Sequence, residues 1–125
     1  MKLNFIHICD TAFLSITGSL NIIGIFEGIT AFKLPAIHPK MTVVANLEGT
    51  TGRHIFEVIL EDPDSKKMAS IKGTFALTSP NKKFGIISNI NNIKLQSKGI
   101  YQIKISVDNT LLGQTSFEVK EGFTQ

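Results

Sequence analysis

Cysteine, arginine and long apolar runs are nearly absent from this 125-residue chain. The single cysteine, Cys9, cannot form an internal disulfide, which favours a reducing compartment. The single arginine, Arg53, stands among thirteen basic residues at a net charge of +3, and arginine supplies most bidentate contacts to phosphates and bases. No apolar run has the length that a membrane-spanning helix needs. We therefore predict a cytoplasmic protein that binds neither nucleic acid nor a membrane.

Charged residues are also few. They make up 18% of the chain, and the mean hydropathy of +0.16 is on the apolar side for a small soluble domain. We therefore expect part of the apolar surface to serve a partner. Asn4, His7 and Asp10 interrupt the apolar N-terminal stretch, which argues against a signal peptide. The length predicts a single domain over residues 1–125.

Apolar and polar residues alternate through the last third of the chain. Tyr101, Ile103, Ile105 and Val107 share one face of an expected strand. Turn-forming residues follow at 108–110, and alternation resumes up to residue 119, so we predict a closing hairpin. Because no segment keeps a helical period over three turns, the chain is predicted to be all-β. The expected architecture is an antiparallel β-sandwich of about eight strands, immunoglobulin-like or C2-like.

Turn residues divide the rest of the chain into short apolar stretches. Strands are expected at residues 3–9, 20–29, 41–47, 53–61, 68–77 and 84–93. Bends are expected at residues 10–15 and 79–81. The segment 33–39 contains two prolines, and we expect it to cross from one sheet to the other. Tyr101 follows Gly99-Ile100, the placement of a tyrosine corner, so its hydroxyl should reach a backbone group.

Three segments of the first half carry a family resemblance. They are Phe-Ile-His-Ile-Cys-Asp at residues 5–10, Gly-Ser-Leu-Asn-Ile-Ile-Gly-Ile-Phe at 18–26, and Leu-Pro-Ala-Ile-His-Pro at 34–39. With the closing hairpin, this order resembles a group of small bacterial proteins of unknown function. Ser19 stands where that group has lysine. The resemblance implies a β-sandwich fold and a cytoplasmic location, and it implies no activity.

Metal binding and nucleophilic catalysis find little support in the sequence. His7 and Cys9 share a face of a strand, and with His38 or His54 they would offer zinc ligands. Ordinary packing is the favoured interpretation, because only one close pair is seen. Asp10 beside Cys9 should raise the pKa of the thiol, which opposes a nucleophilic role. No motif for a nucleophile elbow or a phosphate loop occurs, and no cofactor is expected.

The acidic segment 61–64 offers carboxylates to calcium. A calcium site usually needs six or more oxygens, and Lys66 and Lys67 beside the segment would oppose a cation. A solvated turn is therefore the favoured interpretation.

The two-faced apolar strands provide the best functional evidence. A sandwich strand needs only one apolar face, so the extra apolar surface at Ile23, Ile25 and Ile29 requires cover. That cover would come from segment 33–39, from a second subunit or from a different protein. We predict a non-enzymatic interaction module that binds a protein partner or a second copy of itself. The alternative is a small-ligand-binding or sensor domain, and an enzyme of unknown class ranks third.

Overall fold

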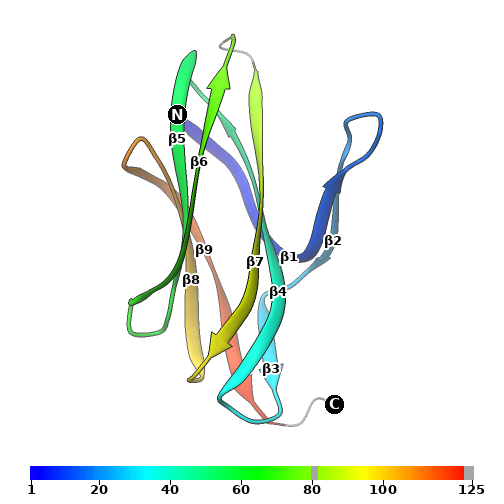
Figure 1. The fold of residues 1–125 in the computed structure, drawn as a ribbon, viewed down its shortest axis with the longest axis vertical. Coiled ribbons are helices and arrows are strands. Elements are labelled where there is room, and N and C mark those ends of the chain that lie inside the picture. Colours follow the sequence, from blue (N-terminus) through cyan, green and yellow to red (C-terminus); the bar gives the residue numbers. More distant parts are fainter. Residues whose placement is uncertain (80–81, 123–125) are drawn as a thin grey trace.

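The computed structural model describes residues 1–79 and 82–122, which form nine β-strands and, within those ranges, no helix (Figure 1). The strands are β1 (Lys2–Leu14), β2 (Leu20–Ile25), β3 (Gly28–Ala31), β4 (Ala36–Glu48), β5 (Gly52–Glu61), β6 (Lys67–Leu77), β7 (Lys83–Leu95), β8 (Gly99–Val107) and β9 (Thr110–Glu121). They form a four-stranded sheet in the order β2-β1-β4-β7 and a five-stranded sheet in the order β3-β9-β8-β5-β6.

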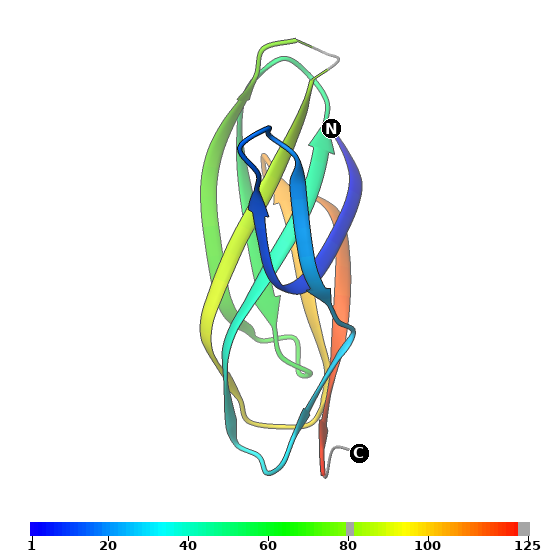
Figure 2. The same ribbon diagram turned by 90° about the vertical axis from the view of Figure 1, so that its right-hand side faces the viewer.

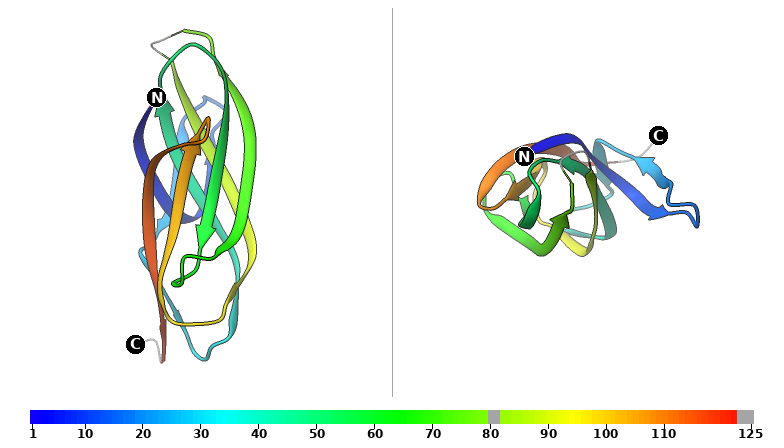
Figure 3. Two further views of the ribbon diagram at one scale, coloured as in Figure 1. Left: turned by 90° about the vertical axis from the view of Figure 1, so that its left-hand side faces the viewer. Right: turned by 90° about the horizontal axis from the view of Figure 1, so that it is seen from above.

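The two sheets enclose a common core, and the predicted all-β class is confirmed. The pairings are antiparallel apart from β3 with β9, which is parallel. One sheet curls into a half-barrel, as the view from above shows (Figure 3, right). A β-sandwich stacks two open layers. The finer prediction of an immunoglobulin-like or C2-like sandwich is therefore not confirmed.

The core lies between the inward faces of the two sheets. The inward face of β8 consists of the alternating residues identified in the sequence, Tyr101, Ile103, Ile105 and Val107, and all four are buried. From the other sheet, β4 contributes four buried side chains at alternate positions, Met41, Val43, Ala45 and Leu47. Burying one large apolar side chain stabilises the fold by about 1.5–3 kcal/mol, so this alternation fixes which face of each strand points inward.

The closing hairpin follows its prediction closely. Asp108 and Asn109 have φ of 51° and 67°, the left-handed conformation that a two-residue hairpin turn requires and that Asp and Asn tolerate. Tyr101 is 1% exposed, and its hydroxyl donates a 2.7 Å hydrogen bond to the carbonyl oxygen of Ser97. Its ring stacks on Phe117 with centroids 5.3 Å apart. The expected structural role of this tyrosine is confirmed.

The N-terminal third differs from its prediction in two places. Residues 10–14 do not bend as expected, because they continue β1 and pair with β2. The single strand expected at 20–29 is two strands that belong to different sheets. Gly24 has φ of +74°, and a Cβ atom there would collide with the carboxylate of Asp10. Glycine therefore permits both the local backbone twist and the close approach of Asp10.

The remaining sequence expectations concern connections. The segment after β3 crosses from the five-stranded to the four-stranded sheet, as predicted for residues 33–39. It is shorter than expected, since β4 already begins at Ala36. Part of the bend predicted at 79–81 lies outside the described residues.

Candidate functional site

A β-hairpin leaves the body of the molecule at the edge of the four-stranded sheet. β1 pairs with β4 as far as Cys9, opposite Thr42, and among the described strands only β2 pairs with it beyond that point. We call this hairpin, residues 11–25, the arm, and the charged residue Asp10 directly precedes it. In the front view and in the view from above, the arm extends away from the other strands (Figures 1 and 3).

The tip of the arm is a tight, well-bonded turn. The amide of Ser15 donates to the carbonyl of Ser19 at 2.8 Å, and the amide of Gly18 donates to the carbonyl of Ser15 at 2.8 Å. Gly18 has φ of +87°, which favours glycine. The hydroxyl of Ser15 also accepts a hydrogen bond from the amide of Ser19 at 3.1 Å. The turn therefore holds the two strands of the arm in register although they project from the body.

The arm exposes large apolar side chains on both of its faces. Ile23 is 52% exposed and Ile25 is 55% exposed. The full set of exposed large apolar side chains in the arm is Phe13, Leu14, Ile16, Leu20, Ile23 and Ile25. Residues 11–26 include no charged residue. Single exposed hydrophobic residues are normal on protein surfaces, whereas an uncharged cluster of this kind marks an interaction surface or an aggregation hazard.

Only part of the predicted interaction face comes together. Ile23 and Ile25 lie on β2, and the segment 33–39 leaves both more than half exposed. Ile29 lies on β3 in the other sheet, beside Val119, where it packs against the core. The structure therefore removes Ile29 from the face. It adds Phe13 and Leu14, which lie in the bend expected at 10–15, together with Ile16 and Leu20. The absence of charge over residues 11–26 was the signal that could have found them.

A groove separates the arm from the body. Its volume is about 380 Å³. Leu14 and Leu20 line it on the arm, and Val44, Phe84 and Ile87 line it on β4 and β7. Viewed from the side of the arm, the hairpin lies over β4 and β7 (Figure 2). The lining is mainly apolar, so both the arm and the groove beneath it present surface that gains free energy when water is removed.

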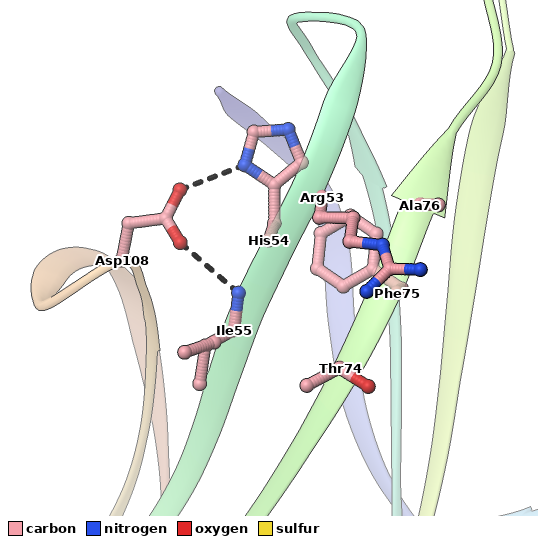
Figure 4. Close-up of a pocket in the computed structure, with 7 residues that line it drawn as sticks. All are labelled: Arg53, His54, Ile55, Thr74, Phe75, Ala76 and Asp108. Atoms are coloured by element: carbon pink, nitrogen blue, oxygen red, sulfur yellow. Dashed lines mark hydrogen bonds and ion pairs between the residues drawn. The ribbon is translucent and has the colours of Figure 1, made fainter.

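A second pocket, of about 620 Å³, lies at the opposite sheet around Arg53, His54 and Asp108 (Figure 4). His54 is 8% exposed, and its Nδ1 lies 2.7 Å from Oδ2 of Asp108. Its Nε2 lies 2.8 Å from the carbonyl oxygen of Thr50. Both neighbours accept hydrogen bonds, so the ring satisfies both only as an imidazolium. The bond to Asp108 and that to Thr50 raise the pKa of His54.

Asp108 also fastens the closing hairpin to β5. Its Oδ1 accepts a hydrogen bond from the amide of Ile55 at 3.0 Å. The hydrogen bonds from His54 and Ile55 lower the pKa of the Asp108 carboxyl. The carboxylate is thus committed to structural partners. This pairing could not be predicted from the sequence, because His54 and Asp108 are far apart along the chain.

The candidate zinc ligands do not assemble into a site. His7 stacks on Phe5, and His38 lies beside Phe26. Over residues 1–79 and 82–122, no group of three His, Cys, Asp or Glu side chains is placed to hold a metal ion. Cys9 is fully buried. Burial raises the pKa of its thiol, and Asp10 raises it further, so the thiolate is disfavoured as the sequence indicated.

The acidic segment 61–64 forms a self-contained turn, as predicted. Oδ1 of Asp62 accepts hydrogen bonds from the amides of Asp64 and Lys66, both at 2.9 Å. Glu61 pairs with Lys104 at 3.0 Å. These carboxylates stabilise the turn and the adjacent strand.

Comparisons with known proteins complete the description. Within the described part of the chain, no helix is long and apolar enough to cross a membrane. A search of curated proteins finds no match. A family model matches residues 4–120, which include the arm, the groove and both sheets. The chain therefore belongs to DUF6941, a family of unknown function.

Proposed function

We propose that this chain is a non-enzymatic interaction module that binds protein through its arm. One observation carries the proposal: an ordered hairpin projects from the body with six exposed large apolar side chains and no charge. Exposing such a surface to water is unfavourable unless a partner covers it. The two-layered β-scaffold, which we propose to be sandwich-like, serves to hold the arm in position.

The compartment is part of the same proposal. Cys9 is the single cysteine and it is buried as a free thiol. A fold that is held together by its core and uses no disulfide is suited to a reducing environment. We therefore propose that the module acts in the cytoplasm.

Affinity capture from the native cell tests the proposal. Tagged wild-type chain is compared with the double variant Ile23→Lys, Ile25→Lys, in which two charges enter the arm. Ile100→Lys is the matched control, because Ile100 is an exposed isoleucine on β8 in the other sheet. We expect the wild type and the control to retain a protein that the double variant does not retain. Equal retention by all three chains would contradict the proposal.

A small-ligand module is the second candidate function. The pocket around Arg53 and His54 has a volume in the range of small-molecule sites, and Arg53 offers a guanidinium to an anionic ligand. It ranks second because Asp108, the carboxylate in the same pocket, would repel an anion. Titration calorimetry with small carboxylates and phosphates tests it. Heat that disappears in Arg53→Gln supports the site, and no heat with any of them rejects it.

A further inference from the structure

We propose that the partner of the arm is a second copy of this chain, and that two copies clasp each other reciprocally, each seating its arm in the groove of the other. This inference rests on the proposed function and names the partner. In the complex, four layers follow one another across the interface. They are the body of the first copy, the arm of the second copy, the arm of the first copy and the body of the second copy.

The two faces of the arm require a partner that reaches both. Side chains alternate along a strand, so Leu20 lies on one face of β2 and Ile23 lies on the other. Leu20 and its cross-strand neighbour Leu14 line the groove of their own chain. Ile23 points away from that groove and is exposed. A protein that packs against one face alone would leave the other face in water.

Reciprocal clasping covers both faces and the groove at once. The Ile23 face of the entering arm meets Phe84 and Ile87 on the groove of the other copy. The opposite face of the entering arm, which has Leu14 and Leu20, packs against Leu14 and Leu20 of the other copy's arm. Each copy thus provides both the inserted part and the receiving part, which is the self-complementarity of a closed, two-fold symmetric dimer. The groove of about 380 Å³ has room for side chains only, so the arm swings outward where β1 leaves β4.

Charge selects a second copy over a different protein. The chain has a net charge of +3, yet residues 11–26 include no charged residue. Different partners are commonly matched by opposite charges, which guide their encounter and orientation. Two identical surfaces always present the same charge to each other, so a surface for self-association avoids repulsion by having none. The arm meets this condition, and a single charged residue, Lys83, lines the groove that receives it.

Disulfide cross-linking between two variants that each gain one cysteine tests the arrangement. Chains with Ile23→Cys and Ile87→Cys carry tags of different size and are mixed under mild oxidation. The native Cys9 is buried and stays in place as an internal control. The two new thiols are on separate chains, so any bond between them joins two copies. A complex holds them at roughly millimolar effective concentration, so we expect about 1000-fold faster cross-linking than for Ile100→Cys mixed with Ile87→Cys at about micromolar protein.

Each outcome has one meaning. Rapid bonding of Ile23→Cys to Ile87→Cys supports the clasp. Bonds that join only Ile23→Cys to itself indicate edge-to-edge pairing of β2 strands and overturn it. Cross-linking no faster than in the control also overturns it. In that case, arm-dependent capture of a different protein would preserve the proposed function, whereas capture unaffected by charges in the arm would refute both.

Discussion

Replacing Tyr101 by phenylalanine removes a single hydroxyl from the core and tests the role assigned to the tyrosine corner. The hydroxyl donates a 2.7 Å hydrogen bond to the carbonyl of Ser97, and the ring keeps its stacking on Phe117 in the variant. A net contribution of about 1 kcal/mol is typical of such a bond. Ser97 itself is exposed, so water can solvate its carbonyl in the variant, and the loss should lie at or below that value.

Chemical denaturation with urea measures this loss directly. Thermal denaturation provides a second measurement, because for a chain of this length about 1 kcal/mol corresponds to a fall of roughly 3–5 °C in the melting temperature. Tyr101→Ala is the comparison, because it also removes the ring and should cost about 3–5 kcal/mol. An unchanged free energy of unfolding in Tyr101→Phe would show that the hydroxyl does not stabilise the corner. A loss as large as that of Tyr101→Ala would show that the ring itself had moved, and either result would refute the reasoning.

Two further predictions concern a charge pair and a glycine. The hydrogen bond to Asp108 raises the pKa of His54, so the stability that the charged pair contributes is complete below pH 6.5 and is lost as the pH rises through the raised pKa. The free energy of unfolding measured with urea should therefore fall with pH in the wild type and not in His54→Gln. An equal pH dependence of the two chains would contradict this prediction. Gly24→Ala should cost more than about 1 kcal/mol, because it combines a positive φ with a collision at Asp10. Gly18→Ala is the control with a positive φ and open space, and an equal loss of melting temperature in both variants would exclude the collision.

The closing hairpin was predictable from local sequence. Alternation from Tyr101 to Val107 fixes the buried face, and Asp108 and Asn109 tolerate the positive φ that the turn requires. Both signals are local, and the tertiary structure agrees with them. The all-β class follows from the same kind of evidence along the rest of the chain.

The arm was not predictable in the same way. Apolar residues on both faces of a strand usually indicate a covered strand, whereas Ile23 is exposed on an edge strand. Whether β2 and β3 form one strand or two depends on which neighbours they pair with, and periodicity has no information about pairing. The contact between His54 and Asp108 was unpredictable for the same reason, because it forms only once β5 pairs with β8.

Sedimentation velocity over a wide range of protein concentration tests the central claim most directly. The wild type and the control Ile100→Lys should sediment as dimers, and the double variant Ile23→Lys, Ile25→Lys should sediment as a monomer with an unchanged circular dichroism spectrum. A wild type that stays monomeric at every concentration, or a double variant that dimerises as well as the wild type, would contradict the account.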